Sequence, residues 1–331
     1  MPFQLNPAKV PIWNSDQQLQ LGVQPNSQTL DEVSNAQERL INLLFQGIAE
    51  DQLELVGKSV GLSNAEAKGL VDTLRPSLLQ SSGSTETASK FDARFAEIIR
   101  IGFETDTTPE VVLAKRAATL IELPLLDRTG LLMIRTLTEA GFRRFETTDY
   151  QSVLRTDLGE LGYPEGALGT SKLTAARSLL SQHGPRIVLE HPAKRRKKSA
   201  ALMVISAMHR VNPKNYRSLT TDHIAIEYGI ASLTVSPVIR PGTTQCLGCR
   251  DLWQVEQDPD WASKAIQLAA RQDQLDDGAG LLLATSLAAK TICRFVDKGE
   301  ASSGYQLNLS NRVLNEKNWQ LHPNCNCRTS Y

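Results

Sequence analysis

The sequence predicts an α/β protein in which an N-terminal winged-helix module precedes a Rossmann-like, mostly parallel α/β domain with a four-cysteine zinc site. Three observations lead to this fold class. Short alternating strands and three amphipathic helix patterns fill residues 1–80, and a strand–loop–helix–strand pattern lies within residues 91–331. Residues 81–90 between them are rich in Ser, Gly and Thr, which predicts a linker. Four of the five cysteines fall in two tight pairs.

The first part opens with a predicted antiparallel sheet. Apolar and polar residues alternate over Val10–Trp13 and again over Leu19–Val23, with a polar turn at Asn14–Asp16 between them. This pattern predicts a hairpin, to which Gln28–Leu30 adds a third short strand.

Three helices are predicted after this sheet. Ser34 is an N-cap candidate for the first, and Gly61 ends the second, which begins near Asp51. Ser63 and Glu66 form a capping box that opens the third. A small sheet with three helices is the pattern of a winged helix.

The second part begins with the unit of a parallel sheet. Ala117–Leu123 is a predicted strand, Gly130–Gly141 a helix, and Arg144–Asp149 a second strand that ends in an acid. The periodicity predicts further strands at 186–189, 201–206 and 232–236, helices at 171–181, 261–271 and 278–296, and late antiparallel strands at 305–309 and 319–321.

The cysteines predict a structural metal site. Cys246 and Cys249 form a CxxC pair, and Cys325 and Cys327 form a second close pair near the C-terminus. Zn²⁺ takes four thiolates at tetrahedral corners, and two such pairs can supply them. All four positions would be filled, so the ion would stabilise the fold and leave no open position for catalysis. The alternative is two unrelated pairs of buried or oxidised cysteines.

A nucleotide site is expected where the first strand meets its helix. A Rossmann-like unit holds phosphate with a G-x-G-x-x-G loop and ribose with an acid about 20 residues further on. Asp149 fits the acid, although a strand-end acid can equally cap a turn. If Gly130 is the third glycine, Leu125 and Asp127 replace the other two. A carboxylate repels phosphate and is well suited to cap the helix, so nucleotide binding is not expected.

Several features occur in the order typical of one superfamily. They are the strand–loop–helix at Gly130, Asp149, the segment Arg155–Tyr163, Lys172, the CxxC after Pro241–Gly242, and the final cysteine pair. In these the chain resembles ThiF-type proteins of the ubiquitin-activating-enzyme superfamily. The closer resemblance is to the ThiF-like cyclodehydratase partner protein of thiazole/oxazole-modified peptide (bacteriocin) biosynthesis. It is carried by residues 237–252, 258–261 and 319–327.

The resemblance implies a function. In that branch the winged helix is a recognition element that binds the leader of a ribosomal precursor peptide by adding a strand to its sheet. The ThiF-like domain there is a non-catalytic scaffold that presents the peptide to a YcaO-type enzyme, which uses ATP to cyclise Cys, Ser or Thr. Members often form homodimers through the ThiF-like domain.

The adenylating branch of the superfamily gives the alternative function. There the same fold uses ATP on a C-terminal carboxylate, and the resemblance places Asp149, Arg155 and Lys172 around that nucleotide. Leu125 and Asp127 break the loop, which favours the scaffold and argues against catalytic residues in this chain. A winged-helix DNA-binding regulator is a second alternative.

Composition bears on the partners. The 36 basic and 36 acidic residues balance, and the third helix carries only Lys68 and Arg75 as basic residues, so nucleic acid is not an expected partner. The apolar run 281–295 is short and interrupted by Lys290 and Arg294, which predicts a buried helix and no membrane span. With no signal-peptide pattern and metal-type cysteines, a cytoplasmic setting is expected.

Three remaining features have structural interpretations beside functional ones. Cys293 lies in an apolar helix pattern and is expected to be a core cysteine, the alternative being a thioester nucleophile. The basic run Lys194–Lys198 predicts a solvated connection, the alternative being a site for nucleic acid or an acidic peptide. His322 precedes the last cysteine pair and could support the metal ligands. Trp253 and Trp261 are expected in the core.

Overall fold

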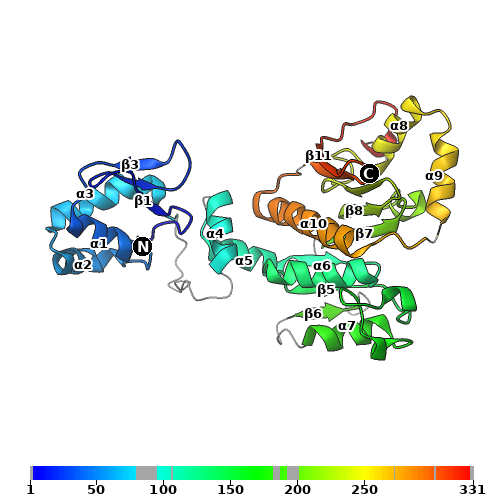
Figure 1. Ribbon diagram of the computed structural model, residues 1–331, viewed down its shortest axis with the longest axis horizontal. Helices are drawn as coiled ribbons and strands as arrows, with labels where there is room; N and C mark the ends of the chain where they lie inside the picture. The colour runs from blue at the N-terminus through cyan, green and yellow to red at the C-terminus, as the bar shows by residue number, and fades with distance from the viewer. Residues whose placement is uncertain are drawn as a thin grey trace. The chain divides into compact units, whose positions relative to one another are not determined.

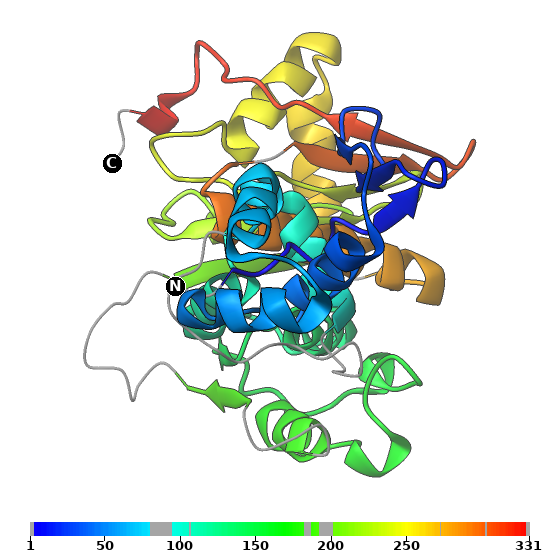
Figure 2. The same ribbon diagram turned by 90° about the vertical axis from the view of Figure 1, so that its left-hand side faces the viewer.

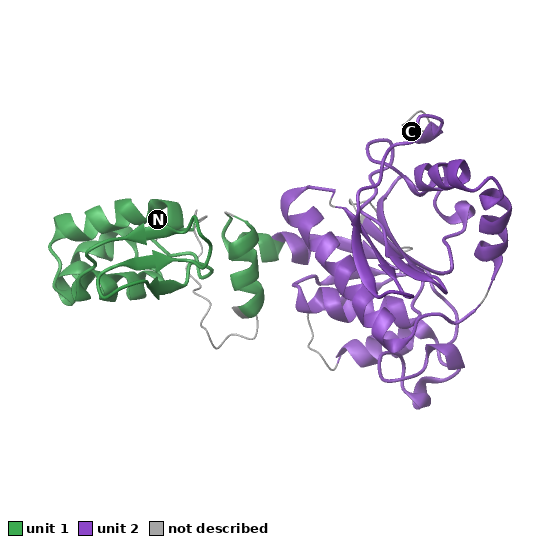
Figure 3. Cartoon of the chain, turned by 45° about the horizontal axis from the view of Figure 1, so that its top comes forward, with its two compact units in different colours: residues 1–114 green, residues 115–331 purple. Residues whose placement is uncertain are grey.

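The computed structural model describes residues 3–79, 95–105, 107–181, 187–191, 201–271, 273–301 and 303–328. The chain divides into two compact units, residues 1–114 and 115–331 (Figure 3). The predicted N-terminal module, residues 1–80, belongs wholly to the first unit. The predicted linker, residues 81–90, and the basic run Lys194–Lys198 lie outside the described residues.

The first unit contains the predicted sheet and helices (Figures 1 and 2). The antiparallel strands β1 (Pro11–Trp13), β2 (Leu19–Leu21) and β3 (Gln28–Leu30) pair in the order β1-β2-β3. Helices α1 (Asn35–Leu44), α2 (Leu53–Val60) and α3 (Asn64–Leu74) share one apolar core with β2 and β3.

Local sequence signals set the ends of these helices. The Ser34 side chain accepts a hydrogen bond from the Gln37 N–H, and that of Ser63 from the Glu66 N–H, so both caps are confirmed. Gly61 ends α2 with a φ of 97°, in the left-handed region that favours glycine. Two further helices were not predicted: α4 (Phe95–Glu104) and α5 (Pro109–Ala118).

The second unit is built on an eight-stranded mixed sheet in the order β11-β10-β9-β8-β7-β4-β5-β6. The five strands from β8 to β6 are parallel, and the pairs β8–β9, β9–β10 and β10–β11 are antiparallel. The strands are β4 (Leu120–Glu122), β5 (Arg144–Glu146), β6 (Val188–Glu190), β7 (Ala201–Met208), β8 (Asp222–Tyr228), β9 (Ser232–Val235), β10 (Gly304–Asn308) and β11 (Val313–Lys317).

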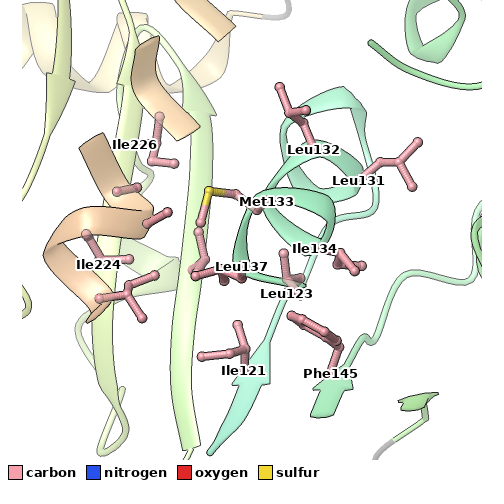
Figure 4. Packing of buried hydrophobic residues seen from close by; sticks show 14 of the residues in the cluster. Ile121, Leu123, Leu131, Leu132, Met133, Ile134, Leu137, Phe145, Ile224 and Ile226 are labelled. Atoms are coloured by element: carbon pink, nitrogen blue, oxygen red, sulfur yellow. The ribbon is translucent and has the colours of Figure 1, made fainter. Parts of the chain in front are cut away.

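Helices cover both faces of this sheet. One face packs against α6 (Arg128–Glu139) and α10 (Gly278–Lys298), and Figure 4 shows Met133 and Leu137 of α6 beside Ile121 and Ile224 of the strands. On the other face Leu247 joins a smaller core with β7 and β8. The remaining helices are α7 (Lys172–Ser181), α8 (Leu247–Gln257) and α9 (Trp261–Ala270).

Four strand predictions need correction. Ala117 and Ala118 end α5, so β4 begins only at Leu120. β8 was missed because six of its seven residues are buried, which removes the alternation that marks a half-exposed strand. The last strand is β11, and the strand predicted at 319–321 is wrong. Arg144–Asp149 was predicted too long, since β5 ends at Glu146, three residues before Asp149.

Helix α10 includes the apolar run that the sequence placed in the interior. Among the described residues it is the one helix long and apolar enough to cross a membrane, but 61% of its most apolar window is buried within the protein. Cys293 of this helix is 5% exposed and belongs to the main core, as predicted. These features are those of a core helix.

Candidate functional site

The four predicted metal ligands come together at the start of α8. Cys246 is the N-cap of this helix, Cys249 lies in its first turn, and a turn at 322–325 brings Cys325 and Cys327 beside them. The Sγ atom of Cys246 lies 3.9 Å from that of Cys249 and 3.7 Å from that of Cys325. The Sγ atoms of Cys249 and Cys327 are 3.6 Å apart, and all four lie within 4.8 Å of one another.

This arrangement fits a metal ion. Thiolates about 3.5–4 Å apart can share one tetrahedral Zn²⁺ with Zn–S distances of about 2.3 Å. Gly248 lies between the two pairs, and a Cβ there would meet the Sγ atoms of Cys246 and Cys325 at 3.3 and 3.7 Å. The backbone therefore leaves room for the sulfur atoms to converge.

The four thiols are not expected to ionise together unless a cation balances their charge. Burial raises the pKa of Cys246 to about 12 and, helped by the neighbouring sulfurs, raises the pKa of Cys327. Burial also opposes ionisation of Cys249, but hydrogen bonds from the backbone N–H groups of His322 and Cys246 and from neighbouring thiols lower its pKa overall. Four thiolates at these distances repel one another, so a dication is needed to balance their charge.

His322 supports the cysteine turn and does not point its ring nitrogens at the cysteines. Its Nε2 lies 3.0 Å from Oε1 of Glu256, and its Nδ1 accepts a hydrogen bond of 3.1 Å from the Asn324 N–H. Its carbonyl accepts a bond from the Cys325 N–H at 3.0 Å, and its ring packs edge-on against Trp253. Glu256 and Asn324 therefore fix the orientation of the ring.

The loop before α6 lies where a phosphate would be expected. Asp127 is the N-cap of α6, as predicted, and its Oδ1 accepts a hydrogen bond of 2.8 Å from the Gly130 N–H. Its Oδ2 accepts a bond from the Ser206 hydroxyl at 3.2 Å. Burial raises the pKa of Asp127, while the Gly130 N–H and Lys172 act in the opposite direction.

Gly130 is required for the close packing of this turn. A Cβ at Gly130 would lie 2.1 Å from the carbonyl oxygen of Leu125, which no real contact allows. The loop thus keeps a tight strand-to-helix turn, but a carboxylate of the chain itself takes the helix N–H group that would face an anion.

Asp149, proposed from the spacing of a nucleotide motif, and Lys172, proposed from the resemblance, meet in the protein interior. The carboxylate of Asp149 accepts hydrogen bonds of 2.9 Å from the backbone N–H groups of Leu126 and Gln151. The Nζ of Lys172 lies 3.5 Å from Oδ2 of Asp149 and 3.2 Å from Oδ2 of Asp157. All three ionisable side chains are buried, so the ammonium group is balanced by two carboxylates of the chain.

Arg155 is not part of this group. It begins the short 3₁₀ helix Arg155–Asp157 and is exposed, and its guanidinium makes no hydrogen bond or ion pair with the described residues. Two buried residues beside Asp149 and Lys172 were not predicted from the sequence. One is Asp157, and the other is Tyr163, whose hydroxyl donates a 2.9 Å bond to the Leu126 carbonyl. Both lie in the segment Arg155–Tyr163 that carried the resemblance.

Comparisons with known proteins bear on the fold. No family model matches the sequence, and no curated protein matches it. Solved structures do share the fold. Escherichia coli MccB with AMPCPP and MccA has a TM-score of 0.68 at 13% identity, covering 99% of each chain. MccB with succinimide gives 0.68 at 14% over the full length of both chains. PaaA gives 0.66 at 12%, over 94% of this chain and 98% of the other. The likeness supports the expected ThiF-like α/β fold.

Proposed function

We propose that this protein is a non-catalytic scaffold that binds the leader of a ribosomal precursor peptide and presents it to a YcaO-type, ATP-dependent cyclodehydratase. The observation that carries the proposal is the state of the loop before α6. There Asp127 caps the helix, while Asp149 and Lys172 neutralise each other in the interior.

The similar solved structures provide the contrast. MccB has been solved with ATP, and it is described as a Microcin C7 biosynthetic enzyme in complex with N-formylated MccA. In this chain Asp149 and Lys172, the acid and the lysine that the resemblance places at a nucleotide, are engaged with the protein itself. Binding a nucleotide would require both to break their present contacts and leave a buried charge without its partner, which costs several kcal/mol.

The peptide-binding part of the proposal rests on the first unit, read as a winged helix. Its sheet has two edges, β1 and β3. Hydrogen bonds from the Gly22 N–H to the Val10 carbonyl and from the Asn14 N–H to the Gln18 carbonyl fix the bonded pairs between β1 and β2. Since bonded and non-bonded pairs alternate along antiparallel strands, Gln20 directs its backbone groups to β1.

The same alternation shows which backbone groups each edge offers to an added strand. Thr29 pairs with Gln20, which already faces β1, so the N–H and C=O of Thr29 point away from the sheet. On β1 the outward positions include Pro11, which has no N–H. Trp13 of β1 also faces outward, but Pro11, two residues before it, interrupts that edge. The β3 edge offers a donor and an acceptor on exposed Thr29, and we assign the added strand to it.

Gln28 holds this edge in place. Its side-chain amide donates a 2.6 Å hydrogen bond to the Thr73 carbonyl at the end of α3, and its Oε1 accepts a 2.6 Å bond from the Ser77 hydroxyl. The edge is thus anchored to the helix beside it. A rigid edge reduces the entropy cost of adding a strand.

Two experiments on the full-length, zinc-loaded protein test the proposal. Calorimetry with Mg-ATP is expected to give no binding at millimolar nucleotide, whereas micromolar binding would replace the scaffold by the adenylyltransferase. Selection from a displayed library of candidate leader peptides is expected to enrich sequences that perturb the amide signals of β3. Enriched peptides that leave the β3 signals unchanged would contradict strand addition.

A further inference from the structure

The second unit contains a cavity of about 460 Å³ whose walls combine buried charge with aromatic rings. It lies over the ends of β8 and β9 and is bounded by α8, α9 and the segment after β11. Three of the four tryptophans line it, Trp253, Trp261 and Trp319. Trp253 and Trp261 were expected in the core, but both are only half-buried. None of the metal ligands lines this cavity.

Two arginines lie against the aromatic walls. The guanidinium of Arg210 lies 5.1 Å from the ring centre of Trp261, and that of Arg250 lies 5.1 Å from that of Trp319. Arg210 is 4% exposed. Burial and the neighbouring Arg250 lower the pKa of Arg210 to about 10, still well above neutral pH, so its side chain remains charged.

Carboxylates of the protein neutralise part of the positive charge on these two arginines. Arg250 donates two hydrogen bonds to Glu227, of 2.5 and 2.9 Å. Glu227 also accepts a bond from the Val211 N–H. Arg210 contacts Asp251, which accepts a further bond from the Tyr216 hydroxyl. The carboxylate of Glu227 is thus engaged at both oxygens, while Oδ1 of Asp251 accepts no hydrogen bond but lies against both guanidinium groups.

Some buried hydrogen-bond donors of these residues nevertheless have no acceptor. The Nε–H of Arg210 and the indole N–H of Trp261 are buried and have no hydrogen-bond acceptor among the described residues. The Nε of Arg250 also makes no hydrogen bond, but it lies 3.7 Å from Oδ1 of Asp251. A buried donor without an acceptor loses the hydrogen bond that it makes to water in the unfolded chain, so native proteins seldom keep several in one place. All three residues line the same cavity. Arg210 and Trp261 therefore offer this cavity two buried donors that have no acceptor among the described residues.

We propose that this cavity binds a carboxylate attached to a flat or apolar group, with the carboxylate on Arg210 and the Trp261 indole N–H and the apolar part between the tryptophan rings. Arginine and indole N–H groups are strong donors to a carboxylate, and aromatic rings bury apolar area without much loss of conformational entropy. The carboxylate could belong to a free small acid or to the C-terminus of a peptide. This site does not depend on the proposed leader-binding function.

Indole N–H signals in NMR spectra of the full-length protein test the site. The probes are 3-phenylpropionate with its neutral amide, and a short peptide ending in phenylalanine with either a free or an amidated C-terminus. The carboxylates are expected to shift the Trp261 indole signal and leave that of Trp13 unchanged, since Trp13 lies in the other unit. The amides are expected to bind roughly tenfold more weakly or not at all.

Two variants separate binding from folding. Trp261→Phe keeps an aromatic wall and removes the N–H, and Arg210→Lys keeps the charge and removes the Nε–H donor. Each is expected to weaken carboxylate binding about tenfold, followed by the indole signals of Trp253 and Trp319 in the same cavity, with an unchanged amide spectrum elsewhere. If only 3-phenylpropionate or only the peptide with a free C-terminus binds, the site is supported, and the result identifies whether its carboxylate comes from a small acid or from a peptide.

Equal binding of amides and carboxylates, no shift with any probe, or full affinity in Trp261→Phe would overturn the proposal. The Thr29→Pro variant distinguishes it from the leader-binding function, because that change at the β3 edge is expected to leave carboxylate binding intact.

Discussion

The Nζ of Lys172 and the Oδ2 of Asp149 lie 3.5 Å apart in the protein interior. Both residues were candidates for binding a nucleotide, one through phosphate and the other through ribose. Here they bind each other, with Asp157 completing the group at 3.2 Å from the same ammonium. The chain has the acid and the lysine that the resemblance places at a nucleotide, but both are engaged in its own core.

The first prediction concerns Lys172 itself. Lys172→Met is expected to destabilise the protein by about 3–5 kcal/mol, because two buried carboxylates lose their counter-ion. Urea denaturation measures the difference. Lys264→Met, which removes an exposed ion pair with Asp258, is the control and should unfold like the wild type. Equal stability of the two variants would mean that Asp149 and Asp157 do not need the ammonium group.

The second prediction concerns the cap of α6. Asp127→Ala removes the acceptor of the Gly130 N–H and is expected to cost about 1–2 kcal/mol, whereas Asp127→Asn keeps an acceptor and costs less. Thermal denaturation of both variants at neutral pH is the measurement. If alanine is tolerated as well as asparagine, the cap does not hold the end of the helix.

The raised pKa of Asp127 gives the third prediction. Burial raises this pKa above its ordinary value of 3.8, so between that value and the raised one the folded state binds more protons than the unfolded state. The contribution of Asp127 to stability therefore falls as pH rises through this window. The stability of the wild type relative to Asp127→Asn should be greater at pH 4 than at pH 7. A difference that grows with rising pH would contradict the assigned direction.

The fourth prediction concerns the metal. Removing one ligand by Cys246→Ser is expected to abolish stoichiometric zinc binding and to lower the melting temperature markedly, since a structural zinc contributes on the order of 10 kcal/mol to folding. Elemental analysis and calorimetric melting measure both effects. Cys293→Ala is the control, because this core cysteine is not among the four. A zinc-free variant that melts with the wild type would rule out a structural ion.

The fifth prediction tests the β3 edge. Thr29→Pro removes an outward N–H and is expected to weaken leader binding about two- to tenfold, the value of one backbone hydrogen bond. Thr29→Val retains the N–H and is the matched control, so it should bind as the wild type does. Fluorescence anisotropy with a labelled leader peptide measures both. Equal loss in the two variants would point to the side chain and away from strand addition.

Local signals made much of the fold predictable. Helix caps at Ser34 and Ser63 and the stop at Gly61 depend on neighbouring residues, so the sequence alone places them. Strand β8 and helices α4 and α5 were missed for different reasons. β8 is buried on both faces and has no alternation, and α4 and α5 follow a region read as a linker.

The sequence by itself determined the two cysteine pairs and the Asp127 cap, because spacing within a few residues decides which groups can share an ion or a helix end. Only the tertiary structure decided that Asp149 meets Lys172 in the interior and that Arg155 stays outside. It also decided that Arg210, Arg250 and Trp261 face one cavity. The physical reason is that contacts between residues far apart in the sequence depend on strand register and helix packing, which the spacing of residues along the chain does not fix.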